Sequence, residues 1–214
     1  MHKDFDIELK NISKIEGHTH LDVNIKNGKV VSCKLKISEN KRFYTINGDC
    51  LWTGVYYLPE DWTIEKVLRE TKNYPNFDFF VQVGGDASGE VLNSKQLIRP
   101  AGGGASITVY SITKHDLLGL MRRWADFFAH ESCGQCTPCR EGTFRLKEIL
   151  HSSDPDWKMV SALLDNLGRA SFCGLGCAVP IPFNSFAKNV LSKYPEFNIK
   201  LSSEDRKMIC ECFT

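Results

Sequence analysis

Cys133-Gly-Gln-Cys136-Thr-Pro-Cys139 dictates how the C-terminal half of this chain must fold. Three thiolates with two residues between neighbours let one loop curl around three corners of a cube, as in the C-x2-C-x2-C run of ferredoxins. The loop therefore predicts a [4Fe–4S] cluster with Cys133, Cys136 and Cys139 as ligands. We expect Gly134 to let backbone N–H groups approach the inorganic sulfides. We expect Arg140 to place a cation just outside the anionic centre, where it tunes the potential.

A cubane cluster needs a fourth thiolate, and two later cysteines compete for that place. Cys173 lies at the expected end of a helix that returns the chain to the cysteine loop, and Cys177 follows it by one helical turn. Zinc prefers two paired C-x2–4-C arms around a tetrahedron, so three cysteines within one short loop favour a cluster over a zinc ion. Cys177 could also join Cys210 and Cys212 in a second cluster; otherwise these three are reduced thiols.

The cysteine motifs carry a family resemblance. The run Glu131-Ser-Cys-Gly-Gln-Cys-Thr-Pro-Cys-Arg-Glu-Gly142, followed by Ser171-Phe-Cys-Gly-Leu-Gly176, closely resembles the C-terminal part of the NADH-binding flavin subunit of respiratory complex I. The same module occurs in NAD-linked and electron-bifurcating hydrogenases and formate dehydrogenases. The resemblance implies that Cys133, Cys136, Cys139 and Cys173 are the four ligands of one [4Fe–4S] cluster.

The resemblance extends upstream to about residue 41. Phe43–Asp49, Gly54–Pro59 and Val83–Asp86 look like the SLBB-type β-grasp domain of that family, and Gly102–Val109 looks like the strand that leads into its helices. The flavin domain that precedes these modules in the family has no room here, and no G-x-G-x-x-G run occurs. We therefore expect no FMN or NAD site, and we interpret the glycine pairs as turns.

The first forty residues resemble a different family. Ile12-Ser-Lys-Ile-Glu-Gly-His18 and the alternating residues after it resemble the opening hairpin of the large subunit of [NiFe] hydrogenases, where the glutamate, here Glu16, is implicated in proton transfer. That family binds nickel with two C-x-x-C pairs, which this chain lacks, so we expect no nickel site. Two interpretations remain: a generic hairpin that contains E-G-H, or a docking surface for a hydrogenase-type partner.

Composition narrows the class of protein. The 214 residues include 27 Lys and Arg against 26 Asp and Glu, a formal net charge of +1, which argues against nucleic acid or an anionic membrane as the main partner. Hydrophobic residues make up 42% of the chain, as in globular proteins. We find no apolar run long enough to span a membrane and no signal-peptide core, so we expect a cytoplasmic protein. Nine cysteines in a reducing compartment indicate metal or redox chemistry.

Hydrophobic periodicity predicts an α+β fold in which strands precede helices. Together with the resemblance, this implies an N-terminal β-hairpin and an SLBB-type β-grasp domain followed by a four-helix iron–sulfur domain. Alternating residues flank Asn27-Gly28, a pair typical of a type I′ turn. The further strands are expected at Arg42–Asn47, Gly54–Leu58, Phe79–Val83 and Ser106–Tyr110, with a short helix at Ile64–Lys72 capped by Thr63. The expected domains are 1–40, 41–111 and 112–195, with a tail over 196–214.

The four helices are placed by their caps and apolar stripes. Thr113 and Asp116 resemble a capping box before the apolar residues Leu117 to Phe128. A second helix covers Arg140–Leu150, with Phe144 and Ile149 turned inward. Asp154-Pro155 opens a third helix and Pro182 a fourth.

These features predict an iron–sulfur electron-transfer subunit of a multisubunit oxidoreductase of the hydrogenase or NADH dehydrogenase type. It would relay single electrons and would not be catalytic alone. A relay needs a donor and an acceptor, so other subunits of the complex, carrying flavin or iron–sulfur groups, are the expected partners. Two alternatives stay open: a docking subunit with a redox-silent cluster or a zinc site, and an enzyme whose β-grasp domain binds a small ligand.

Overall fold

The computed structural model describes residues 5–10, 19–37, 41–87, 89–102, 104–193 and 202–213. The chain divides into two compact units, one made of residues 1–43 with 57–62 and the other of residues 44–56 with 63–214. The hydrogenase-like segment that contains Glu16 and His18 lies outside the described residues, so its interpretation stays a prediction.

The N-terminal strands form an antiparallel sheet in the order β1-β2-β3, with β1 at Phe5–Lys10, β2 at Thr19–Lys26 and β3 at Lys29–Ile37. The predicted hairpin is confirmed, because Lys26 pairs with Lys29 around a turn in which Asn27 and Gly28 have φ of 51° and 72°. Both residue types tolerate positive φ at low cost. Strand β1 adds a third strand to this hairpin.

A second, mixed sheet has the strand order β5-β4-β8-β6-β7. Its strands are β4 (Lys41–Gly48), β5 (Gly54–Pro59), β6 (Phe79–Val83), β7 (Glu90–Asn93) and β8 (Ser106–Ser111). Strand β8 runs parallel to β4 and antiparallel to β6. Four of the five strands were predicted from the sequence. The four-residue β7 was not, because it is too short to show a period.

Short helices complete the sheet region. Helix α1 covers Ile64–Glu70, and its N-cap Thr63 accepts a hydrogen bond from the Lys66 N–H at 3.2 Å, as predicted. Its buried residues are Ile64, Val67 and Leu68. A 3-10 turn, η1 at Ser94–Gln96, follows β7 and is fixed by a capping box between Asn93 and Gln96.

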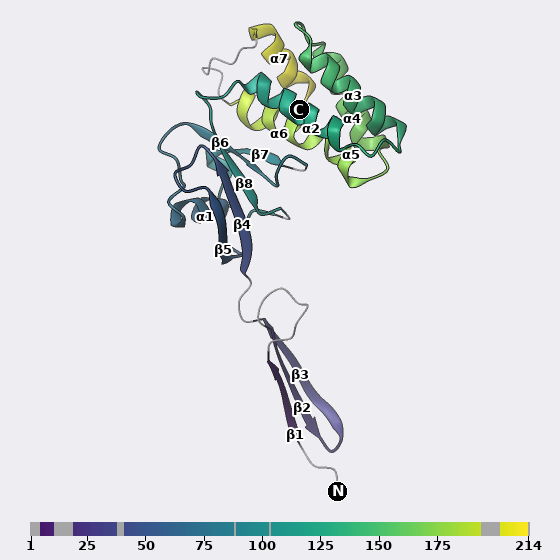
Figure 1. The fold of residues 1–214 in the computed structure, drawn as a ribbon. Helices are drawn as coiled ribbons and strands as arrows, with labels where there is room; N and C mark the ends of the chain where they lie inside the picture. Colours follow the sequence, from purple (N-terminus) through teal and green to yellow (C-terminus); the bar gives the residue numbers. More distant parts are fainter. Residues whose placement is uncertain are drawn as a thin grey trace. The chain divides into compact units, whose positions relative to one another are not determined.

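The C-terminal part is helical, and in Figure 1 these helices gather beyond β6 and β7. The helices are α2 (Leu117–Glu131), α3 (Thr137–His151), α4 (Trp157–Ala170), α5 (Gly174–Ala178), α6 (Pro180–Phe186), the π-helix η2 (Ala187–Leu191) and α7 (Ser203–Cys212). The predicted α+β fold class is confirmed. The tail expected after residue 195 contains a helix, α7, that was not predicted from the sequence.

Several predicted helix starts were wrong by a few residues. Asp116, not Thr113, caps α2 and accepts from the Leu118 N–H at 3.2 Å. Asp156, not Asp154, caps α4 and accepts from the Met159 N–H at 3.0 Å. In each case the cap is the carboxylate that reaches an N–H of the first turn left without a partner inside the helix.

Two further expectations about helices fail. The helix expected to open at Pro182 starts at Pro180, another proline in the first turn. Phe144 of α3 is 57% exposed, whereas Ile149, also expected to be inward, is 8% exposed. The apolar stripe of α3 therefore runs through Leu146, Ile149 and Leu150, and Phe144 lies off it.

Aromatic side chains join the sheet to the helices in one core. Trp124 of α2 packs edge-on against Phe183 and Phe186 of α6, each with ring centres 5.6 Å away. Phe80 of β6 reaches the same Phe186, with a centre-to-centre distance of 5.8 Å. All four rings are fully buried.

Among the described residues, no helix has the length and apolar composition needed to cross a bilayer.

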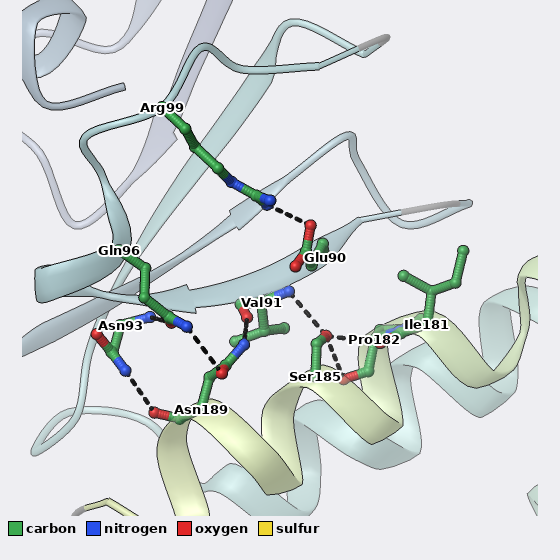
Figure 2. Close-up of polar contacts among 9 residues, drawn as sticks. All are labelled: Glu90, Val91, Asn93, Gln96, Arg99, Ile181, Pro182, Ser185 and Asn189. Atoms are coloured by element: carbon green, nitrogen blue, oxygen red, sulfur yellow. Dashed lines mark hydrogen bonds and ion pairs between the residues drawn. The ribbon is translucent and has the colours of Figure 1, made fainter. Parts of the chain in front are cut away.

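Side chains from α6 and η2 also bond to the outer edge of β7, as Figure 2 shows. The Val91 N–H donates to Ser185 Oγ at 2.9 Å, and the Val91 carbonyl accepts from Asn189 Nδ2 at 2.7 Å. Asn93 Nδ2 donates to the Asn189 carbonyl at 3.1 Å, and Gln96 Nε2 donates to Asn189 Oδ1 at 3.0 Å. The β7 edge is thus satisfied by helix side chains instead of another strand.

Candidate iron–sulfur site

The first part of the candidate site is the loop between α2 and α3. Cys136 is the N-cap of α3 and Cys139 lies in its first turn, so both belong to the start of a helix. Pro138 fits there because the first turn needs no N–H from it. Cys136 and Cys139 are buried, whereas Cys133 is exposed. The loop thus turns two thiols inward and one toward solvent.

Gly134 and Arg140 shape this loop. Gly134 has a φ of +74°, a conformation that side chains rarely adopt. Arg140 Nη1 donates to the Gly134 carbonyl at 3.0 Å, and Arg140 Nε donates to Glu141 at 2.9 Å. The Arg140 guanidinium therefore links the loop to α3, and the Glu141 carboxylate partly neutralises its positive charge.

The second part of the site is the turn between α4 and α5. Cys173 is the N-cap of α5 and is exposed. A hydrogen bond from the Phe172 N–H to the sulfur of Cys136 is the main cause that lowers the pKa of that thiol, followed by a backbone bond at Cys139. This contact joins the turn at residue 172 to the cysteine loop. Hydrogen bonds to the sulfur atoms are among the terms that set the potential of an iron–sulfur cluster.

The charges of the other three predicted ligands act on Cys139. Burial is the largest cause that raises the pKa of Cys139, and the charges of Cys136, Cys173 and Cys133 raise it further. Four thiolates in proximity repel one another unless cations bind between them. The donor set is therefore suited to iron, which ferredoxin-type loops bind through thiolates.

Gly176 allows the two parts to approach. A Cβ at Gly176 would lie 2.4 Å from both Cβ and Oγ of Ser171 and 3.4 Å from Cβ of Cys139. The first distance is too short for any real side chain, so glycine is required where α5 passes between the turn and α3. A similar approach occurs deeper in the bundle, where a Cβ at Gly142 would lie 3.0 Å from Leu167.

Two serines beside the cysteines were not singled out from the sequence. Ser132 Oγ lies 3.3 Å from the sulfur of Cys139 and accepts from the Gly134 N–H at 3.4 Å. Ser171 Oγ is buried and has no hydrogen-bond partner. Each serine stands just ahead of a predicted ligand, in Glu-Ser-Cys and Ser-Phe-Cys, and that position was the available signal.

Three further cysteines lie in the C-terminal part of the chain, Cys177, Cys210 and Cys212. The Cys177 thiol donates to the Ser171 carbonyl at 3.4 Å and borders a hollow of about 660 Å³, which Asp165, Arg169 and Phe213 also line. Burial raises the pKa of Cys210, which packs against the core. The side chain of Cys212 lies outside the described residues, so the second cluster stays a prediction.

Within the described part of the chain, no three His, Cys, Asp or Glu side chains converge on a point that could hold a single metal ion.

The region that contains these cysteines is similar to known proteins. Residues 119–196 match the model of the NADH-ubiquinone oxidoreductase-F iron-sulfur binding region. The F subunit of the NADH-quinone oxidoreductase of Streptomyces coelicolor is 40% identical over 80 residues, which are 35% of this chain and 18% of the relative. Its counterpart in Aquifex aeolicus is 26% identical over 167 residues, covering 72% of this chain and 38% of the relative.

Hydrogenase subunits are similar over a longer stretch. The alpha subunit of the NAD-reducing hydrogenase HoxS of Cupriavidus necator is 29% identical over 181 residues, covering 74% of this chain and 27% of the relative. A crystal structure of an NAD+-reducing [NiFe]-hydrogenase in the H2-reduced state has the same fold over 81% of this chain and 29% of its own, with a TM-score of 0.62 and 24% identity.

The resemblance read from the cysteine motifs is confirmed for the C-terminal part: residues 119–196 match an iron–sulfur binding region, and the relatives that align with the chain are subunits of NADH-quinone oxidoreductases and of an NAD-reducing hydrogenase. The chain spans 18% to 38% of the length of the three curated relatives named above.

Proposed function

We propose that this chain is an electron-transfer subunit of a multisubunit oxidoreductase of the hydrogenase or NADH dehydrogenase type. Cys133, Cys136, Cys139 and Cys173 would hold one [4Fe–4S] cluster, which exchanges one electron at a time when bound. The single observation that carries this proposal is the approach of the Phe172–Cys173 turn to the cysteine loop, inside a region that matches an iron–sulfur family model.

The protein's own contribution would be to hold the thiolates and adjust their environment. Buried Cys136 and Cys139 would exclude water from one side of the cluster, and exposed Cys133 and Cys173 would lie on the side open to a partner. The Phe172 N–H supports the thiolate form of Cys136. Burial, hydrogen bonds to sulfur and nearby charge are the terms that set the potential of such clusters.

The proposal includes no FMN or NAD site on this chain. The sequence motifs support this, since the glycine-rich segments lack the G-x-G-x-x-G run of a dinucleotide fold. Electrons would then enter and leave through other subunits. Flavin or iron–sulfur subunits of an NAD-linked or hydrogenase complex are the partners we propose, since the relatives are named as subunits of such enzymes.

The test uses the full chain, purified without oxygen, and measures iron, sulfide and zinc together with electron paramagnetic resonance after dithionite reduction. We expect about four irons per chain and a fast-relaxing S = 1/2 signal that is lost in Cys133→Ser. About eight irons would bring Cys177, Cys210 and Cys212 into a second site. Zinc without iron would overturn the relay and leave a docking subunit with a structural metal.

A further inference from the structure

The hydroxyl of Ser132 is already oriented toward a predicted ligand. Its Oγ accepts from the Gly134 N–H at 3.4 Å and lies 3.3 Å from the sulfur of Cys139. In the free thiol either atom of the Ser132–Cys139 pair can donate. A cysteine that binds iron has lost its proton, so the hydroxyl must then be the donor.

The hydroxyl of Ser171 lacks a partner although it is buried. A buried hydroxyl without a hydrogen bond is costly, and in a native protein such a group calls for an explanation. Ser171 borders Gly176, and Cys139 borders the same glycine from α3. The two backbone polar groups of this residue are in use, since its N–H donates to the Leu167 carbonyl at 3.3 Å and its carbonyl accepts from the Cys177 thiol. The unpartnered atom therefore lies next to the place where a cluster would bind.

We propose that Ser132 and Ser171 are positioning residues that donate hydrogen bonds to the sulfur atoms of the bound cluster, Ser132 to the Cys139 thiolate and Ser171 to a sulfur on the side of α5. This inference rests on the proposed function and deepens it. It assigns a role to a serine that stands just ahead of a ligand in each of the two motifs and explains the orphaned hydroxyl.

The sign of the effect follows from charge. A reduced cluster carries one more negative charge than an oxidised one, so a hydrogen bond to its sulfur stabilises the reduced form more. The two serines would therefore raise the reduction potential. Removal of either hydroxyl should shift the potential to a more negative value without changing the number of irons.

The experiment measures the midpoint potential of the anaerobically purified, cluster-loaded chain in Ser132→Ala and Ser171→Ala. Proton couplings of the reduced cluster are recorded in H2O and D2O, because a hydroxyl donor contributes an exchangeable proton. Ser152→Ala is the matched control. Its hydroxyl donates to the Ile149 carbonyl at 2.8 Å, at the opposite end of α3 and roughly 20 Å from Cys139 along the helix.

We expect a more negative potential and the loss of one exchangeable coupling in each alanine variant, the wild-type values in Ser152→Ala, and recovery in Ser171→Thr, which keeps a hydroxyl. Loaded alanine variants with the wild-type potential and couplings would overturn this inference and leave the proposed function intact. A shift in only one variant would overturn the role of the other serine. A wild-type chain that binds no iron and sulfide would overturn the proposed function itself.

Discussion

Asn189 Nδ2 donates to the Val91 carbonyl at 2.7 Å, which joins the π-helix η2 to the outer edge of β7 across 98 residues of sequence. Asn189 is 7% exposed, and its own carbonyl and Oδ1 accept hydrogen bonds from Asn93 and Gln96. The sheet and the helical part are therefore fixed to each other by polar contacts as well as by the aromatic core.

The first prediction concerns this contact. Asn189→Ala should lower the free energy of unfolding by about 1–3 kcal/mol, because it leaves the buried Val91 carbonyl without a partner. Urea denaturation of the loaded chain measures the change. Asn184→Ala is the control, since Asn184 is exposed on the adjacent α6, and it should leave the denaturation midpoint unchanged. Equal effects of the two variants would contradict the role of Asn189.

The second prediction compares two glycines of α5. Gly176→Ala should cost about 1–3 kcal/mol of stability and reduce bound iron, because the new methyl group would overlap Ser171. Gly174→Ala should have little effect, since nothing lies within 4 Å of the position its Cβ would take. Iron content and thermal unfolding of both variants check this pair. Full iron in Gly176→Ala would show that α5 can move away from α3 at no cost.

The third prediction separates the two candidates for the fourth ligand. Cys173→Ala should lose iron and the signal of the reduced cluster, because Cys173 acts electrostatically on Cys139 within the group of four. Cys177→Ala should retain about four irons per chain, since its thiol is directed to the Ser171 carbonyl. Iron and sulfide analysis distinguishes the two. The opposite result would assign the fourth corner to Cys177.

The fourth prediction concerns Cys50, which lies beside Asp49 at the end of β4. Burial and the charge of Asp49 raise the pKa of the Cys50 thiol to about 11. Alkylation by iodoacetamide should therefore be slow near neutral pH and should accelerate as the pH rises toward that value, because the thiolate is the nucleophile.

Asp49→Asn tests the electrostatic part of this effect. Removal of the carboxylate charge should lower the pKa of Cys50 and speed its alkylation at a fixed, mildly alkaline pH. Peptide mass mapping follows each cysteine separately, and the exposed Cys33 serves as the internal reference. An unchanged rate at Cys50 in Asp49→Asn would mean that burial alone raises its pKa.

Local patterns in the sequence predicted most of the strands and the type of fold. Alternating residues around Asn27-Gly28 predicted the β2–β3 hairpin, because turn chemistry and period-two burial are both local properties. The same reasoning located the Thr63 cap of α1. The cysteine motifs indicated the resemblance to the iron–sulfur binding region, because the motifs are long and specific in residue type and spacing.

Features that depend on distant contacts were not predictable. Thr113 and Asp116 are both plausible caps by residue type, and the choice is made in three dimensions, where Thr113 bonds Ser111 instead. Asn189 of the π-helix bonds Val91 of β7 across 98 residues, a contact that no local pattern reveals. The orphaned hydroxyl of Ser171 likewise becomes visible only when α5 is packed against α3.

The occupied edge of β7 has a consequence for self-association. In the five-stranded sheet as described, β5 and β7 are the two outer strands, and Ser185 and Asn189 already take the outward N–H and carbonyl of Val91. Edge-to-edge growth of a sheet into a fibre requires two open edges on every copy. Because β7 is occupied, pairing through β5 would end at two copies. The helices therefore prevent this sheet from growing into an amyloid-like fibre.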